Sequence, residues 1–120
     1  MDDEVRATFP RSYRIVRGSD YRTAYKKGLK LDSERFVLFS RENGLNHPRL
    51  GLTVSRKVGG AVARNRVKRL FREIFRRSRV GISAPVDLVV NAKRTCATAG
   101  YQALNEEFLA LVRRLLQSKG

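Results

Sequence analysis

Apolar side chains recur at helical spacing in the second half of the chain. Val67, Leu70, Phe71, Ile74 and Phe75 fall at i, i+3, i+4, i+7 and i+8, which is the pattern of a helix with one buried face. A second stripe near the carboxyl end predicts a terminal amphipathic helix, and its members are Tyr101, Leu104, Phe108, Leu111, Val112 and Leu115. Both helices are expected to pack their apolar faces into a common core.

A third and shorter helix is predicted near the amino end. Tyr21, Ala24 and Tyr25 fall at i, i+3 and i+4, so they share one face of that helix. Ser19 can accept a hydrogen bond as its N-cap, and Gly28 can end it. The two tyrosines are therefore expected to lie side by side.

Four further segments are typical of β-strands, because their apolar residues either alternate with polar ones or form a continuous apolar run. These segments are residues 29–33, 36–41, 49–55 and 86–92. The last of them, VDLVVNA, indicates a buried strand. Between the second and third segments, Asn43-Gly44 is a strong signal for a hairpin turn. The pattern thus predicts that these two strands pair with each other.

Alternation along the strands assigns their side chains to faces. Phe39 lies on the face opposite Phe36, and the small residues Gly51 and Thr53 lie opposite Leu50. Apolar residues on both faces of one strand require either two covering layers or one open binding surface. The small residues on the Phe39 side would leave room for a ligand backbone to approach.

The predicted order is α-β-β-β-α-β-α, which indicates an α+β fold with a mixed four-stranded sheet packed by helices. At 120 residues the chain is the size of a single domain. Residues 1–13 show no periodicity and are interpreted as an extended or flexible arm, and residues 14–120 as one domain.

Charge changes what these elements are expected to do. The chain carries 26 Lys and Arg against 11 Asp and Glu, a net charge of +15, which exceeds the need for solubility and favours an anionic partner. Eight of the cations lie between Arg64 and Arg79, against one acid, Glu73. A cationic stripe opposite the apolar one is formed by Asn65, Arg69, Arg72 and Arg76. Such a stripe can bind phosphates; a merely solvated helix face is the alternative.

Membranes and oxidising compartments are disfavoured as settings. No apolar run approaches the ~20 residues of a membrane span, and the helix stripe is needed for the core. The amino end does not have the pattern of a signal peptide. A single cysteine, Cys96, excludes an internal disulfide. A cytoplasmic protein is expected.

The chain lacks a familiar catalytic pattern. Its only histidine, His47, lies beside Pro48 in a predicted turn and is interpreted as a solvated loop residue. Cys96 is interpreted as a packing residue, and the acids are scattered without a metal-ligand spacing. The sequence therefore favours a binding protein without catalytic groups of its own.

Three aromatic residues suggest the kind of nucleic acid. Tyr21 and Tyr25 on one helix and Phe39 on a strand next to Arg41 could stack on unpaired bases, each worth ~1–3 kcal/mol. Alternatively, all three are core residues. The residue pattern leaves both interpretations open.

The segment VSRKVGGAVARNRVKRLFREIFR, residues 54–76, closely resembles the signature of the bacterial ribonuclease P protein subunit, with Arg64-Asn65-Arg66 at its centre. The similarity extends in the family's element order over about residues 14–116, and includes SDYRTAYKKG, RFVLFS, GLTVS and VDLVVNAKR. The match is far more specific than a basic patch.

The resemblance implies an auxiliary role in an endoribonuclease. In that family a large RNA subunit is the catalyst and removes the 5′ leader of precursor tRNA with Mg²⁺, which RNA and substrate mainly hold. The protein is expected to be a monomer that binds the RNA subunit and the leader and raises the affinity for metal ions. The resemblance also implies a left-handed crossover for the unit 49–55, 61–78, 86–92, against the usual right-handed preference.

Two binding surfaces are implied in the same way. The residues that match the RNA-subunit surface are Arg64, Asn65, Arg66, Lys68, Arg69 and Arg72. Those that match the leader surface are Arg14, Tyr21, Tyr25, Phe39, Arg56 and Lys57. Tyrosine stands at two positions where the family usually has Phe, which adds a hydroxyl, and Arg56 replaces a more usual Lys.

Two other functions are considered. A ribosomal or other structural RNA-binding protein would suit the size and charge, but not the 54–76 signature. A stand-alone nuclease would need carboxylate or histidine clusters, which the sequence does not show.

Overall fold

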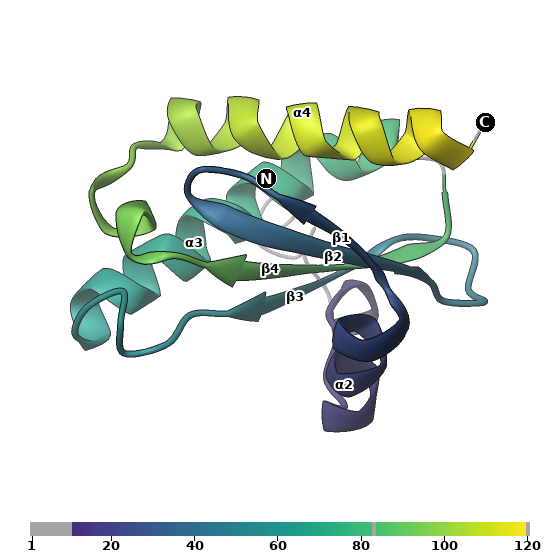
Figure 1. The fold of residues 1–120 in the computed structure, drawn as a ribbon, viewed down its shortest axis with the longest axis horizontal. Helices are drawn as coiled ribbons and strands as arrows, with labels where there is room; N and C mark the ends of the chain where they lie inside the picture. The colour runs from purple at the N-terminus through teal and green to yellow at the C-terminus, as the bar shows by residue number, and fades with distance from the viewer. Residues whose placement is uncertain (1–10, 83, 120) are drawn as a thin grey trace, which may run out of the picture.

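The computed structural model describes residues 11–82 and 84–119. Figure 1 shows one four-stranded sheet, with helices α3 and α4 on one face and α2 on the other. The helices are α2 (Gly18–Lys27), α3 (Ala61–Ser78) and α4 (Tyr101–Lys119), with 3₁₀ turns η1 (Arg11–Tyr13), η2 (Arg79–Gly81) and η3 (Arg94–Thr98). The strands are β1 (Leu29–Asp32), β2 (Phe36–Glu42), β3 (Arg49–Thr53) and β4 (Val86–Ala92). This confirms the predicted order and the α+β class.

The sheet has the order β1-β2-β4-β3, and its pairing corrects one prediction. Strand β4 lies between β2, to which it is antiparallel, and β3, to which it is parallel. The hairpin predicted at Asn43-Gly44 is therefore wrong. Gly44 does turn the chain with a φ of +72°, but β4 is buried along its length except at Asn91 and takes the central position. The actual hairpin joins β1 and β2.

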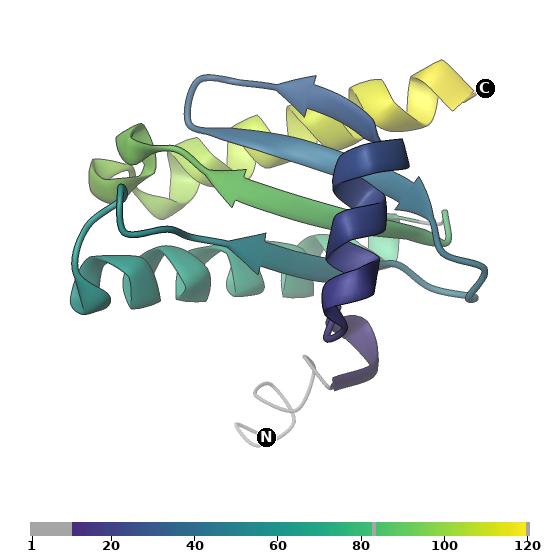
Figure 2. The ribbon, with the colours of Figure 1, turned by 60° about the horizontal axis from the view of Figure 1, so that its bottom comes forward.

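The crossover from β3 through α3 to β4 is left-handed, as the family resemblance implied. In Figure 2, α2 crosses in front of the sheet, β3 and β4 both run to the left, and β4 lies above β3. Helix α3 is seen below β3 and lies on the far face of the sheet, away from α2. A chain that returns behind the sheet while it moves upward in this way traces a left-handed turn. The consequence is that α3 and α2 lie on opposite faces of the sheet.

The main core lies between the sheet and the helices α3 and α4. The predicted apolar stripe of α3 faces it: Val67, Phe71, Ile74 and Phe75 are fully buried, and Leu70 packs at its margin. The ring of Phe71 meets Phe36 of β2 edge-on at 5.1 Å. Local periodicity was enough to predict this face of the molecule.

Helix α2 sits on the other face over a much smaller apolar cluster, whose buried members are Ile15, Ala24 and Val89. The helix begins one residue before the predicted cap. The N–H groups of Asp20 and Tyr21 already donate to the carbonyl of Arg17, so Ser19 lies inside the first turn and the predicted Ser19 cap is wrong.

The end of α2 at Gly28 follows the prediction. A Cβ on Gly28 would lie 2.4 Å from the Ala24 carbonyl oxygen and 2.8 Å from that of Ser40, so only glycine fits this approach.

The predicted amino-terminal arm falls mostly outside the described residues, which begin at Arg11. Residues 11–13 form the turn η1, and Arg14 forms a parallel bridge to Leu50 at the outer edge of β3. None of the helices within the described ranges is long and apolar enough to cross a membrane.

Candidate nucleic-acid interface

The exposed side of α3 carries the central part of the predicted RNA-binding set. Asn65, Arg69 and Arg72 are exposed, and Lys68 is half-buried beside them. The side chains of Lys68 and Arg69 make no hydrogen bond or ion pair with any other residue in the described ranges. Because a helix places i, i+3 and i+4 side chains on one face, these cations form a surface on which phosphates could be bound.

Other basic residues of α3 are used within the chain. Arg66 donates to the carbonyl oxygens of Ala97 at 3.3 Å and Ala99 at 2.8 Å, so its guanidinium ties α3 to the segment before α4. Its predicted contact with RNA would compete with these bonds. Arg64 is half-buried, and its Nε has no hydrogen-bond partner among the described residues.

Glu73 binds two further cations of α3, of which Arg76 belongs to the predicted stripe and Arg77 does not. It accepts hydrogen bonds from Arg76 and, at 2.7 Å, from Arg77, whose guanidinium also lies over the Tyr101 ring. The hydrogen bond from Arg76 is the main reason that the pKa of Glu73 lies below its usual value. The available cationic surface is therefore concentrated around Lys68, Arg69 and Arg72.

The three predicted aromatic residues come together on the sheet face that α2 partly covers. The rings of Tyr25 and Phe39 meet edge-on with centroids 4.9 Å apart. Tyr25 is exposed, whereas Tyr21 and Phe39 are half-buried. We call Tyr21, Tyr25 and Phe39 the aromatic platform. The three rings are partly exposed and are also held by neighbouring residues. Rings in this state can stack on an unpaired base.

Both tyrosine hydroxyls of the platform are bound to β3. The Leu52 N–H donates to the Tyr21 Oη at 3.2 Å, and the Tyr25 Oη is hydrogen-bonded to the Thr53 Oγ1. A Cβ on Gly51 would lie 2.9 Å from the Tyr21 ring. Burial raises the pKa of Tyr21 above its usual value, so its hydroxyl keeps its proton at neutral pH.

A hollow of about 340 Å³ joins the platform to the basic helix. Its lining residues are Arg11, Arg14, Ile15, Val16, Tyr21, Leu50, Leu52 and Arg72. Arg72 thus reaches from α3 to the side of Tyr21, and no acid lines the hollow. The two predicted surfaces are therefore not separate but meet here.

Arg56 and Lys57, the remaining predicted leader residues, are exposed in the turn after β3. Lys57 lines a second hollow, of about 660 Å³, at the carboxyl ends of β3 and β4, together with Thr53, Asn91 and Lys93. Lys57 therefore lies near Thr53, whose hydroxyl is hydrogen-bonded to Tyr25 of the platform.

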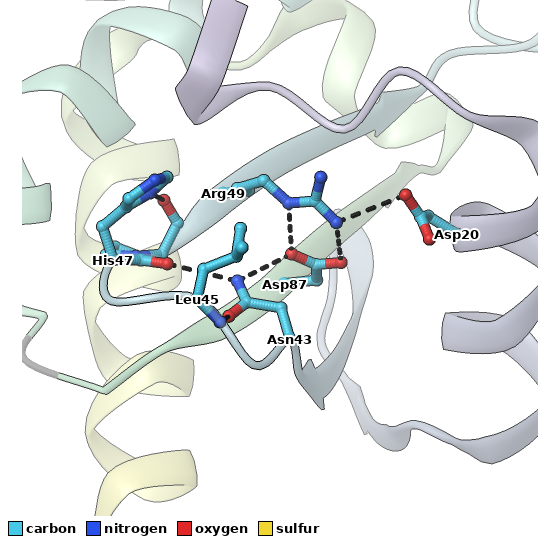
Figure 3. Close-up of polar contacts among 7 residues, drawn as sticks. Asp20, Asn43, Leu45, His47, Arg49 and Asp87 are labelled. Atoms are coloured by element: carbon cyan, nitrogen blue, oxygen red, sulfur yellow. Dashed lines mark hydrogen bonds and ion pairs between the residues drawn. The ribbon is translucent and has the colours of Figure 1, made fainter.

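An ion-pair network beside α2 was missed by the sequence analysis (Figure 3). Asp87, only 6% exposed, accepts from the Arg49 Nε at 2.8 Å and Nη2 at 2.7 Å, and from the Asn43 Nδ2 at 2.9 Å. The same Arg49 Nη2 lies 3.3 Å from an Asp20 oxygen. Asp87 raises the pKa of Arg49, whose guanidinium stays charged. The available signal was Asp87 near the start of a strand that was predicted to be buried, because a buried carboxylate requires a partner.

The residues considered for catalysis have structural contacts. His47 lies in the β2–β3 loop as predicted, but it is half-buried: its ring packs against Tyr13 at 4.5 Å, and its Nδ1 lies 3.0 Å from the Pro48 carbonyl oxygen. Cys96 is buried, which raises the pKa of its thiol to about 11 and confirms it as a packing residue. Across the part of the chain that the structure describes, no three His, Cys, Asp or Glu residues gather as a metal site would require.

Comparison with known proteins gives one consistent family. The model of the family described as Ribonuclease P matches residues 9–116. A curated relative from Streptococcus pneumoniae (strain Hungary19A-6), named ribonuclease P protein component, is 34% identical over 103 residues, which is 86% of this chain and 84% of that protein.

Two solved structures extend the similarity to the fold. The RNase P protein from Thermotoga maritima is 35% identical, with a TM-score of 0.78 over 84% of this chain and 96% of its own. The RNase P protein of Staphylococcus aureus is 33% identical, with a TM-score of 0.77 over 87% and 94%. Each similarity spans most of both chains, so it concerns the whole domain and not one motif.

Proposed function

Because this chain belongs to the ribonuclease P protein family, it is the protein component of a tRNA-processing endoribonuclease, and we propose how its surfaces divide the binding of RNA. The basic side of α3 binds the RNA subunit through Arg64, Asn65, Arg66, Lys68, Arg69 and Arg72. The platform side binds the 5′ leader of precursor tRNA through Arg14, Tyr21, Tyr25, Phe39, Arg56 and Lys57. The protein acts as a monomer in the cytoplasm.

The hollow beside Tyr21, where the two surfaces meet, is the observation that most strongly supports the binding of RNA there. It brings a cation of α3, Arg72, together with Arg14 from the amino-terminal segment and the edge of the aromatic platform. An RNA strand needs phosphate contacts along its backbone and stacking surfaces for its bases. The hollow offers the first, and the adjacent rings of Tyr25 and Phe39 offer the second.

The chain's part in the reaction is to bind and orient RNA. Mg²⁺, held mainly by the RNA subunit and the substrate, supplies the activation of the attacking water and the stabilisation of the leaving oxygen. The protein's cations reduce the phosphate repulsion that separates the RNA subunit from its substrate. Phosphates of the two RNAs that are brought together in this way bind metal ions more tightly than either RNA alone. Its contacts to phosphate are expected to be largely independent of base sequence.

A pair of substitutions tests the division of surfaces. Arg69→Ala removes a cation with no partner among the described residues, so it should weaken binding to the RNA subunit about tenfold and lower the salt slope by about one. Phe39→Ala should leave that binding unchanged and weaken binding of precursors with a leader several nucleotides long by about tenfold. Both affinities are measured over a salt series, with mature tRNA as the ligand that lacks a leader.

Equal loss of RNA-subunit binding in both variants would overturn the two-surface proposal. Cleavage at limiting Mg²⁺ provides the control for function: a bacterial ribonuclease P RNA alone, this protein alone and the two together are compared. Cleavage at the mature 5′ end should be restored only in the combined sample. Cleavage by the protein alone would instead reveal catalytic groups within the chain.

A further inference from the structure

We propose that the network of Asp20, Arg49 and Asp87 is a positioning device: it sets α2 on the sheet and thereby aligns the aromatic platform for single-stranded RNA. Asp20, Arg49 and Asp87 are not themselves among the residues that the proposed leader site assigns to binding. The inference rests on the proposed leader-binding role of the platform, and its test separates the two.

Helix α2 has little apolar contact with which to fix its orientation. Ala24 is its only buried residue, and the cluster beneath it contains only Ile15 and Val89 besides. The two tyrosines that it carries are not fully buried either. Because few buried contacts mean a low local free energy of opening, the polar contacts of α2 have an unusually large share in holding it.

The inner end of the network is rigidly defined. Asp87 belongs to the central strand β4, and its side chain, taken by itself, is 9% exposed. Both of its oxygens are bound by Arg49, and one of them also accepts from Asn43. A bidentate pair of this kind allows the guanidinium a single orientation. Arg49 therefore presents a fixed cation to whatever lies above the sheet.

The outer end of the network is the first turn of α2. Asp20 lies 3.3 Å from the Arg49 Nη2 and directly precedes Tyr21, while Tyr25 follows one turn later. Each of these three residues is thus joined to the sheet by a polar contact. Asp20 holds the amino end, the Tyr21 hydroxyl accepts from Leu52, and the Tyr25 hydroxyl meets Thr53.

Release of the amino end changes the position of both rings, because they move with the helix. A binding site loses function when its side chains shift by more than about 0.5 Å. The platform also depends on the Tyr25 ring standing edge-on to Phe39, a residue of the sheet and not of the helix. The contact between helix and sheet therefore determines the geometry of the site.

Asp20→Asn tests this proposal, because simple charge effects predict the opposite result. The variant removes an acid from a strongly basic protein, so non-specific electrostatics would tighten RNA binding. If the network positions the platform, affinity for a precursor with a several-nucleotide leader falls instead, by roughly 3- to 10-fold. Affinity for mature tRNA and for the RNA subunit stays unchanged, and so does the thermal midpoint. Glu106→Gln, on the exposed side of α4, makes the same charge change away from both surfaces and serves as the matched control.

Amide hydrogen exchange of the free protein gives a readout that does not depend on RNA. The Leu52 N–H is bound by the Tyr21 hydroxyl, so its exchange reports whether α2 is seated. Asp20→Asn should accelerate exchange at Leu52 by roughly tenfold and leave Val90, in the centre of β4, unchanged.

The outcomes separate the two claims. If Phe39→Ala weakens leader binding while Asp20→Asn behaves like Glu106→Gln, the positioning role is wrong and the leader site stands. If Asp20→Asn lowers the melting temperature and all RNA affinities together, the network is only structural and the proposal fails. If Phe39→Ala has no effect, the leader site is wrong; exchange at Leu52 then decides the positioning role, which fails if Leu52 keeps its wild-type protection.

Discussion

The two faces of the sheet are held in very different ways. Among the residues that the structure describes, one continuous cluster toward α3 and α4 contains 21 buried apolar residues, whereas the cluster toward α2 contains three. The first face consists of rings and branched side chains in full contact. The second leaves its rings half-exposed and relies on hydrogen bonds and ion pairs. The difference shows how a chain of 120 residues keeps a stable core and still presents aromatic side chains to a partner.

The largest effect is expected where one phenylalanine is removed from each face. Phe71→Ala should destabilise the protein by about 3–5 kcal/mol, because its fully buried ring leaves a cavity. Phe39→Ala should cost only about 1 kcal/mol, since that ring is half-exposed, lies at the margin of the small cluster under α2 and meets Tyr25 edge-on. Urea denaturation measures both. Similar losses would mean that the α2 face contributes as much to stability as the core.

Gly51→Ala is expected to have the next largest effect, and it is confined to the α2 face. The new methyl group would lie 2.9 Å from the Tyr21 ring, so helix or ring must move. We expect a loss of about 1–3 kcal/mol and weaker leader binding.

Gly81→Ala is the matched control for Gly51→Ala, because nothing lies within 4 Å of the added atom. It should change stability by no more than about 0.5 kcal/mol. Thermal melts of the two variants make the comparison. If the Gly51→Ala protein is as stable as the Gly81→Ala protein, the Tyr21 ring does not pack closely against Gly51.

The smallest effect concerns Glu107, which ties the β1–β2 hairpin to α4 on the core side. Burial alone would raise the pKa of Glu107, but hydrogen bonds from the Ser33 hydroxyl, the Arg35 N–H and the Arg35 guanidinium outweigh it and lower the pKa. A lowered pKa in the folded state contributes stability above the unfolded value of 4.5, and this contribution is lost as the pH falls through the folded value.

Glu107→Gln should therefore cost about 1–2 kcal/mol at neutral pH, and its difference from the wild type should shrink below about pH 4.5. Urea denaturation at a series of pH values measures this difference. If the difference in free energy of unfolding stays constant down to about pH 3, the charge of the Glu107 carboxylate does not contribute to holding the hairpin against α4.

The elements that the sequence predicted well are those whose signal is local. The stripe of α3 follows from side-chain spacing alone, and burial of Val67, Phe71 and Phe75 confirms it. The Asn43-Gly44 signal was also local, and the chain does turn there. Which strand pairs with β2, however, depends on β4, more than 40 residues later. The local signal therefore predicted the turn and not the partner.

The candidate site shows the same limit. The sequence alone suggested Tyr21, Tyr25 and Phe39 as a possible stacking surface, and the structure brings them together. The sequence could not show that Arg66 is bound to the carbonyls of Ala97 and Ala99, because that contact depends on how a distant turn packs against α3. The pairing of Glu73 with Arg76 and Arg77 was readable from the i, i+3 and i+4 spacing.

The topology of the sheet also dictates the order in which the nascent chain can complete it. Of the strand pairs in the described ranges, only β1–β2 is available before β4 has been made, since β2 and β3 both pair with β4. Strand β3 and helix α3 thus emerge from the ribosome before β4, against which β3 pairs, has emerged. Until β4 emerges, the apolar stripe of α3 has no complete sheet to pack against. The strong positive charge of the same segment opposes self-association of the nascent chains during this interval.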